Sequence, residues 1–250
     1  ILDKSRSSQV PLSHLKDINR ESILSVDRYS AYKTLVKEKD GSLRLAWCWS
    51  HVRRDFLNLA KNQPDHEEWA MNWVEDIRNL YHLNNLRLEI AHMPQEFDKA
   101  DVVLRNSVSE TKQNMLHELA CETLHPEHKK VLESLQRHWD GLILFVDNPE
   151  IPMDNNEAER ALRGPVVGRK NFYGSCSLWS GLLASMLFSI FQTLLLWKIN
   201  PQVWLQNFLR ACAENGSLPL EDVSPFLPWN MSEQALTIYR APPNPDNDTS

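Results

Sequence analysis

Apolar and polar positions in the first fifty residues predict two short strands with a helix between them. The run Ser22 to Asp27 is apolar and ends in an acid, which favours a buried strand. Apolar residues at helical spacing predict a helix over 29–39, and the aromatic-rich segment 43–49 predicts a second strand. Residues 1–22 are polar and mixed, so we expect a loop and one strand end there.

The middle of the chain carries a helical pattern without a strand signal. Ser50 is a candidate N-cap for a helix over 51–62. From residue 64 to 139, apolar residues recur every three or four positions, and Pro94 and Pro126 divide the stretch into three helices. We therefore expect an all-helical segment here.

The C-terminal part predicts further helices. Residues 141–153 are apolar and then broken by prolines, and Asp154 is an N-cap candidate followed three residues later by a glutamate. An apolar helix is expected over 181–197 and an amphipathic helix over 201–214. The last ten residues, 241–250, have the composition of a disordered tail.

The apolar segment 181–197 is the one place where a membrane span has to be considered. It lies at the short limit of a spanning helix, contains several serine, glutamine and threonine residues, and has no second span beside it in the sequence. A buried core helix is the prediction, with no membrane partner.

Composition narrows the class of protein. The chain has 250 residues, 42% of them hydrophobic, and a net charge of −6, which indicates a globular protein and excludes a wholly basic nucleic-acid binder. Only 7 glycines are present, and no glycine-rich phosphate loop occurs. The 4 cysteines form no CxxC pair and no signal peptide is visible, so a reducing, cytoplasmic location is expected.

Charge is distributed unevenly. Residues 28–62 hold eight Lys/Arg and three Asp/Glu, whereas residues 64–140 hold eight Lys/Arg and fifteen Asp/Glu. This contrast predicts a basic working surface and an acidic helical insertion turned away from it.

Asp27 is the first candidate for chemistry. An acid at the end of a hydrophobic strand emerges at the carboxyl edge of a sheet, where α/β proteins place ligands. The alternative is an aspartate that caps the turn after the strand, and the residues alone do not exclude it.

The second candidate is the acidic and amide cluster that starts at Asp154. On a helix, Asn156, Glu159 and Arg163 share a face, and this set suits a divalent metal beside a phosphate. Glu157 lies roughly 200° round the helix from Glu159, so only one of the two can face a given site. A solvated helix with Glu–Arg pairs is the alternative.

Two further groups are weaker signals. Cys48 and His51 have the spacing of half a zinc site, but no second half is visible, and a buried cysteine with a histidine at a strand–helix elbow is the alternative. Residues 168–171 predict a short basic loop able to hold a phosphate backbone, or else a basic surface patch.

Four strings together resemble the transposases of the insertion sequence 66 family, in order and spacing from about residue 1 to 232. They are SVDRYSAYK (25–33), AWCWSHVRRDF (46–56), MDNNEAERALRGPVVGRKNF (153–172) and FLPWNMS (226–232).

The resemblance implies a DDE-type recombinase on a ribonuclease H-like α/β fold, a mixed sheet with flanking helices. In such enzymes three carboxylates hold two Mg²⁺ ions, or Mn²⁺ in their place, which activate water or a DNA 3′-hydroxyl for attack on a phosphodiester. Asp27 matches the second acid and Glu159 the third, so both are expected to be catalytic metal ligands. Glu157 falls on a variable position of the family pattern.

The same resemblance assigns the other residues. Cys48 and His51 match a C-x-x-H signature that forms a structural or DNA-contacting elbow. The implied partners are DNA, both insertion-sequence ends and target, and further copies of the chain in an active homo-oligomer. The expected DNA-binding residues are His51, Arg53, Arg54, Arg163, Arg169 and Lys170.

The expected organisation has four parts. Residues 1–63 form a partial catalytic core with the second acid, 64–140 the helical insertion, 141–215 the completion of the core with the third acid, and 216–250 a C-terminal extension and tail. The first acid is missing, because Asp3 precedes Asp27 by too few residues for the intervening strands. We therefore expect a core that is incomplete at the N-terminus.

Three functions remain open from the sequence. The chain is the C-terminal part of an active transposase whose first acid is encoded upstream, or a truncated, inactive remnant that at most binds DNA. An unrelated hydrolase that uses Asp27 and Glu159 as an acid/base pair is the third, with only the two carboxylates in its favour.

Overall fold

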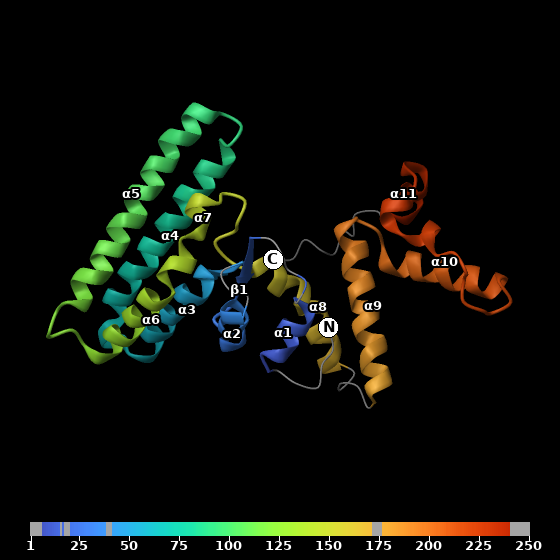
Figure 1. Ribbon diagram of the computed structural model, residues 1–250, viewed down its shortest axis with the longest axis horizontal. Coiled ribbons are helices and arrows are strands. Elements are labelled where there is room, and N and C mark those ends of the chain that lie inside the picture. The colour runs from blue at the N-terminus through green and yellow to red at the C-terminus, as the bar shows by residue number, and fades with distance from the viewer. Residues whose placement is uncertain (1–6, 16, 18–20, 39–41, 172–176, 241–250) are drawn as a thin grey trace. The chain divides into compact units, whose positions relative to one another are not determined.

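The computed structural model describes residues 7–15, 17, 21–38, 42–171 and 177–240 (Figure 1). The chain divides into two compact units, a larger one of Asp3–Arg160 and a smaller one that contains Ala161–Ser250. Each is described by itself below. The predicted disordered tail, 241–250, lies outside the described residues.

The larger unit contains two strands and a series of helices. Its elements in chain order are α1 (Gln9–His14), β1 (Ser22–Val26), α2 (Ser30–Glu38), β2 (Leu43–Trp47), α3 (Trp49–Asn62), the 3₁₀ helix η1 (Pro64–His66), α4 (Glu67–Glu89), α5 (Pro94–Leu119), α6 (Pro126–Leu142), α7 (Leu144–Asp147) and the start of α8 (Asn156–Asn171). The two predicted strands and the helix between them are confirmed. α1 was not predicted, because its six residues carry too short a pattern.

The described sheet has two parallel strands. β1 and β2 pair in register from Ser22 opposite Leu43 to Val26 opposite Trp47, with α2 as the crossover between them. This confirms an α/β element, while the larger mixed sheet that was expected does not occur among the described residues. The carboxyl ends of both strands lie at the same edge, where Asp27 follows β1 and Cys48 follows β2.

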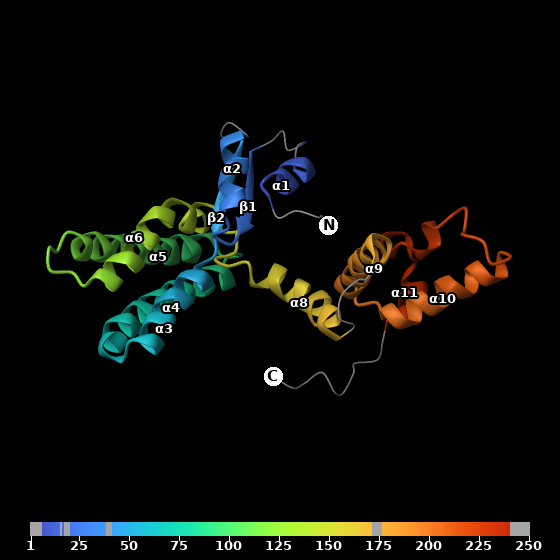
Figure 2. The same cartoon turned by 90° about the horizontal axis from the view of Figure 1, so that it is seen from below.

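The predicted all-helical segment is confirmed as α4, α5 and α6. Pro94 and Pro126 stand at the first turns of α5 and α6, where a missing N–H costs nothing. Figures 1 and 2 show α4 and α5 running side by side, with α3 next to α4 and α6 next to α5. The four helices share one apolar core, whose largest fully buried members include Trp49, Phe56 and Leu104.

Gly141 brings the helical core close to the sheet. A Cβ atom at this position would lie 2.4 Å from the Leu45 carbonyl oxygen and 2.3 Å from Cδ1 of Trp47. The absence of a side chain therefore lets α6 pack directly on β2. This packing connects the insertion to the strand that leads into α3.

The start of α3 differs from the prediction. The helix begins at Trp49, so Cys48 and not Ser50 occupies the N-cap position, and its side chain makes no capping hydrogen bond. Cys48 is fully buried, and the backbone N–H of Trp49 donates to the Met153 carbonyl at 3.0 Å. Packing of the elbow against the segment before α8 therefore replaces a side-chain cap.

The smaller unit contains the remaining helices. They are the end of α8, α9 (Leu178–Leu196), α10 (Pro201–Glu214), the 3₁₀ helices η2 (Ser224–Phe226) and η3 (Pro228–Asn230), and α11 (Glu233–Tyr239). Its small core is centred on Leu194, Ile199, Trp204 and Leu236. Trp204 Nε1 donates to the Phe226 carbonyl at 2.9 Å, which fixes the segment 226–232 against α10.

The expectation that 181–197 forms a buried core helix was wrong. Only Gly181 and Leu194 of α9 are buried within the described residues, since α9 packs on its neighbours through one side. α9 is the one described helix that is long and apolar enough to cross a bilayer, judged by its length and composition alone.

The expected basic loop at 168–171 is also corrected. α8 continues through Pro165 to Asn171, so Arg169 and Lys170 lie in its last turn. Cations are favourable at the C-terminal end of a helix, which offsets part of the cost of the internal proline.

Candidate functional site

Asp27 stands directly after β1 at the carboxyl edge of the sheet. Its side chain is half-buried, and Oδ1 accepts a hydrogen bond from the Tyr29 backbone N–H at 3.1 Å. The turn-capping alternative is therefore present in the structure. Within the described part of the chain, Oδ2 of Asp27 accepts no hydrogen bond, so one carboxylate oxygen is available to a ligand.

Arg28 ties this strand end to two helices. Its guanidinium pairs with Asp55 Oδ2 at 2.6 Å and donates to the His51 carbonyl at 3.0 Å, both on α3, and to Ser134 Oγ of α6 at 3.0 Å. A planar guanidinium can satisfy three acceptors at once. These contacts hold Asp27 at the N-terminal end of α3.

His51 lies in the first turn of α3 and faces α8. Its Nε2 is 3.5 Å from Glu159 Oε1, with 20% of the histidine side chain and 42% of the glutamate side chain exposed. The imidazole and the carboxylate are therefore within ion-pairing distance of each other. The other ring nitrogen, Nδ1, is buried and has no partner among the described residues.

A polar network fixes the start of α8 against α3 and α4. Asp154 Oδ2 accepts from the Tyr81 hydroxyl at 3.1 Å and from Ser50 Oγ at 3.4 Å, while its Oδ1 accepts from the Asn156 N–H at 3.0 Å. Asn156 Nδ2 also donates to Ser50 Oγ at 3.2 Å. Burial, opposed by the hydrogen bond with Ser50 and reinforced by the charge of Asp154, raises the pKa of Tyr81. Tyr81 therefore stays a neutral donor, and the network orients the helix that carries Glu159.

The structure thus links four of the predicted site residues at one edge of the larger unit. Asp27 and Cys48 directly follow the two strands, and His51 lies in the first turn of α3. Arg28, next to Asp27, contacts His51, and His51 contacts Glu159. Glu157 is exposed and takes no part in these contacts.

The predicted DNA-binding cations occupy two different helices. Arg53 and Arg54 are exposed on α3, one turn from His51. Arg163, Arg169 and Lys170 are exposed on α8 and belong to the smaller unit.

Sequence reasoning missed the residues that position the acids. Ser50 was expected only as a cap, and Asp154 as a helix start and the first member of the acidic and amide cluster, without its contacts to Tyr81 and Ser50. Arg28 and Tyr81 carried no signal of their own, because their roles depend on contacts between distant segments. The two carboxylates were chosen as candidates because Asp27 follows a strand and Glu159 lies in the first turn of a helix.

The donor atoms decide which metal suits this edge. Asp27 and Glu159 offer hard carboxylate oxygens, the ligand type that Mg²⁺ and Mn²⁺ prefer. Asn155, one turn before Glu159, has a buried side-chain oxygen without a partner in the described chain. Cys48 and His51 belong to no group of three metal-ligating side chains among the described residues, so the structure adds no support for zinc there.

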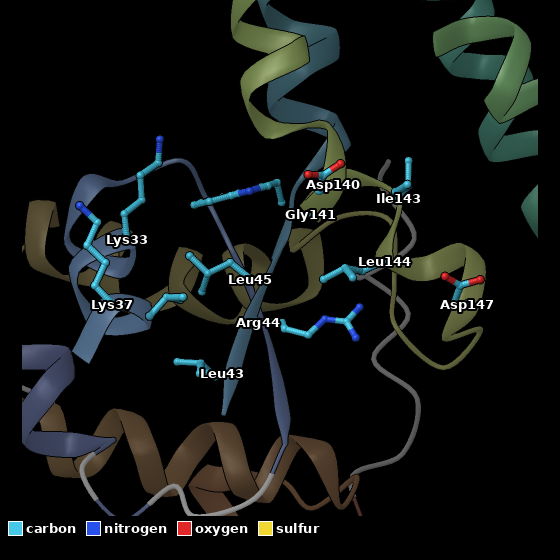
Figure 3. Close-up of a pocket in the computed structure, with 12 residues that line it drawn as sticks. Lys33, Lys37, Leu43, Arg44, Leu45, Asp140, Gly141, Ile143, Leu144 and Asp147 are labelled. Carbon is cyan, nitrogen blue, oxygen red and sulfur yellow. The ribbon is translucent and has the colours of Figure 1, made fainter. Parts of the chain in front are cut away.

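A cavity along β2 is separate from these acids. It has a volume of about 700 Å³ and lies along β2, between α2 and the α6–α7 junction (Figure 3). Figure 3 shows Lys33 and Lys37 on one side of β2 and Asp140 and Asp147 on the other. Neither Asp27 nor Glu159 lines it.

Comparison with known proteins identifies similar chains. Uncharacterized protein y4jD of Sinorhizobium fredii (strain NBRC 101917 / NGR234) is 28% identical over 236 residues, which cover 92% of this chain and 45% of that protein. Uncharacterized protein y4hP of the same organism is 25% identical over 251 residues, covering 94% of this chain and 44% of that protein. The chain therefore spans less than half the length of these relatives. No solved structure matches it significantly.

The family profile described as transposase IS66 family matches residues 1–182. This range includes β1, the elbow at Cys48, the helical segment and the part of α8 that carries Glu159. Because the match extends over most of the chain, the chain belongs to the IS66 family of transposases.

Proposed function

We propose that this chain carries the second and third acids of a DDE-type transposase, Asp27 and Glu159, and acts on DNA phosphodiesters in the transposition of an insertion sequence. Membership of the IS66 transposase family supports the general function. Since the chain spans less than half the length of its relatives, strand cleavage and strand transfer are proposed for the full-length protein.

One observation carries the assignment. Arg28, the neighbour of Asp27, donates to the His51 carbonyl, and the His51 ring contacts Glu159. His51 thereby contacts both Glu159 and the residue next to Asp27, although the two acids are 132 positions apart in the sequence. A purely solvated Glu–Arg helix, the alternative for α8, would need no such connection to the end of β1.

Asp27 and Glu159 would hold Mg²⁺ or Mn²⁺, and the half-exposed state of both side chains leaves room for a phosphate. When bound, such ions activate the attacking hydroxyl and stabilise the leaving oxygen. His51 keeps the Glu159 carboxylate oriented toward the strand end, and the Asp154 network fixes the helix from which Glu159 projects. These residues act by positioning and do not themselves touch the reacting atoms.

The ribonuclease H-like fold is part of the same proposal. β1 is paired with β2 along one edge, and no described strand occupies its other edge. We propose that the strand bearing the first acid pairs there and comes from the part of the full-length protein outside this chain. Each acid would then stand at the carboxyl edge of one sheet or on the helix beside it.

DNA would be held by the exposed cations. Arg53 and Arg54 on α3 flank the acidic edge, and Arg163, Arg169 and Lys170 add a basic row on α8. Contacts of this kind go to phosphates and position the duplex without reading its sequence. A homo-oligomer acting in the cytoplasm, with one copy at each end of the element, completes the proposal.

The test compares the full-length protein with the 250-residue chain on DNA that carries the ends of the element. We expect Mg²⁺-dependent strand cleavage by the full-length protein, loss of cleavage in its Asp27→Asn variant, and no cleavage by the chain alone. DNA binding without any cleavage by the full-length protein would favour an inactive remnant instead. Cleavage that survives Asp27→Asn would refute the assignment of the second acid.

A further inference from the structure

Three histidines lie close together at one end of the helical core. At this end, one connection joins α3 to α4 and another joins α5 to α6. His66 closes η1, between α3 and α4, whereas His125 is the N-cap residue of α6 and His128 lies in its first turn. One nitrogen from each ring falls in a group whose members all lie within 4.8 Å of one another. No other group of three metal-ligating side chains occurs in the described parts of the chain.

The distances approach those of a bound metal. His128 Nε2 and His66 Nδ1 are 3.1 Å apart. Two nitrogens on a tetrahedral Zn²⁺, each at about 2.0–2.1 Å from the ion, are separated by roughly 3.3 Å. His125 is exposed, so its ring can close the remaining gap by a small side-chain rotation.

The surrounding residues orient these rings. His125 Nδ1 accepts from the Glu127 backbone N–H at 3.3 Å, which leaves its Nε2 for a ligand. His128 is stacked on Trp69, with ring centroids 3.7 Å apart and planes 3° apart. Trp69 Nε1 in turn donates to Glu118 Oε2 at 2.7 Å, so the stacking platform is itself fixed. These contacts restrict the orientation of the His125 and His128 rings.

We propose that His66, His125 and His128 form a binding site for a divalent transition metal, with Zn²⁺ as the best-fitting ion. Imidazole nitrogens suit Zn²⁺, whereas Mg²⁺ requires oxygen ligands, so this site is chemically distinct from the acidic edge. Water occupies the fourth position.

The position of the site indicates a structural role. η1 follows the C-terminal end of α3, and His125 and His128 lie at the start of α6. One ion bound by the three histidines would therefore cross-link two connections that are 59 residues apart in the sequence. α3 carries His51 at its other end. A metal cross-link at the far end of α3 would stabilise the helical core without contacting the acids.

The test is Zn²⁺ binding by the untagged 250-residue chain, measured by competition with a chromophoric chelator. We expect one Zn²⁺ per chain, and a rise in the melting temperature on Zn²⁺ addition that a chelator reverses. His125→Ala should weaken binding by about 10-fold or more. Because His125 is exposed, this variant is expected to fold, and its circular dichroism spectrum checks that it does.

His82→Ala is the matched control, since His82 is exposed on α4 of the same core and lies outside the group. Its Zn²⁺ affinity should equal that of the parent, as should that of Glu159→Gln. Co²⁺ substituted for Zn²⁺ should give the visible absorption of a tetrahedral site. Equal Zn²⁺ affinity in the parent and in a His66→Ala/His125→Ala double variant, or no binding by the parent, would overturn the proposal, whatever the outcome of the cleavage assays.

Discussion

His51 Nε2 lies 3.5 Å from Glu159 Oε1, and this contact joins the elbow after β2 to the helix that bears the proposed third acid. His51 is held by its backbone, since its carbonyl accepts from Arg28. The glutamate is more exposed than the histidine, so it is the more mobile partner. The geometry therefore suits a carboxylate that is oriented by the protein and still free to bind an ion.

The first prediction concerns Glu159. In the full-length protein, Glu159→Gln should reduce Mg²⁺-dependent strand cleavage to the level of a no-enzyme control, because an uncharged amide is a much weaker magnesium ligand. DNA binding should stay nearly unchanged. Cleavage of end-labelled DNA and a mobility-shift titration measure the two effects. Glu157→Gln, an exposed neighbour, is the matched control and should cut at the parental rate.

The second prediction separates positioning from chemistry at His51. His51→Ala should lower cleavage by about 10–100-fold and raise the Mg²⁺ concentration needed for half-maximal cleavage, because Glu159 loses the group that orients it. Excess Mg²⁺ should restore part of the activity. A titration of cleavage rate against Mg²⁺ makes this measurement. An unchanged Mg²⁺ requirement, combined with weaker DNA binding, would instead assign His51 to DNA contact.

The third prediction concerns the basic row on α8. Arg169→Ala should weaken binding of the chain to DNA of any sequence, and should reduce the slope of log K against log salt by about one unit, as expected for one lost phosphate contact. Mobility shifts at four salt concentrations give the slope. Arg78→Ala, which removes an exposed cation from the acidic insertion, should leave the slope unchanged. A sequence-dependent loss at Arg169 would point to base contact.

Local patterns were sufficient for most elements of the fold. The strand before Asp27, the proline-initiated helices at 94 and 126 and the amphipathic helix after Asn200 follow from periodicity and capping rules, and the structure confirms them. The helical continuation through Pro165 was not predictable, since proline normally ends a helix. The exposure of α9 was not predicted, because the apolar composition of a helix does not determine how much of its surface other helices cover.

The candidate site was predictable only in part. Asp27 and Glu159 were selected because each belongs to a recognisable string at an element boundary, and their catalytic role stays a prediction. Their connection through Arg28 and His51 depends on tertiary packing, as does the Tyr81–Asp154 hydrogen bond between residues 73 positions apart. The three-histidine group was missed for the same reason, because His66 lies far from the H-x-x-H spacing of 125 and 128.

The fourth prediction is a pH effect on stability through His138. Burial, followed by the nearby charges of Lys33 and Arg28, lowers the pKa of this histidine, while its hydrogen bond to the Ser134 carbonyl opposes the shift. Its Nε2 lies 3.1 Å from Lys33 Nζ and its Nδ1 lies 2.7 Å from the Ser134 carbonyl oxygen, which suits the neutral ring. The folded state therefore resists protonation.

The free energy of unfolding depends on pH because the folded and unfolded chains bind a proton at His138 with different affinity. As pH falls through the ordinary value of 6.5, the unfolded chain binds a proton at this position before the folded chain does, so the free energy of unfolding falls. The loss ends below the folded-state pKa. Urea unfolding at pH 7, 6 and 5 should show a smaller loss on acidification in His138→Gln than in the parent. His82→Gln, at an exposed position, should retain the full loss, and identical pH profiles for parent and His138→Gln would contradict the prediction.

The last prediction concerns Arg87, which is fully buried in α4. Its guanidinium pairs with Asp101 of α5 and donates to the carbonyls of Phe145 and Val146 at 2.9 Å each, so it ties three segments of the helical core together. Burial alone would raise the pKa of Asp101, but hydrogen bonds from Arg105 and Arg87 outweigh it and hold that pKa below its ordinary value.

Arg87→Ala removes this buried cation together with its hydrogen bonds to the Phe145 and Val146 carbonyls, and leaves Arg105 as the remaining cationic partner of Asp101. We expect the free energy of unfolding to fall by about 3–5 kcal/mol, the usual cost of breaking a buried ion pair from one side. Arg78→Ala on the same helix breaks only an exposed i,i+3 pair with Glu75 and should cost less than about 0.5 kcal/mol. Urea unfolding of both variants followed by tryptophan fluorescence measures the difference, and equal losses would mean that Arg87 is not the connection between α4, α5 and α7.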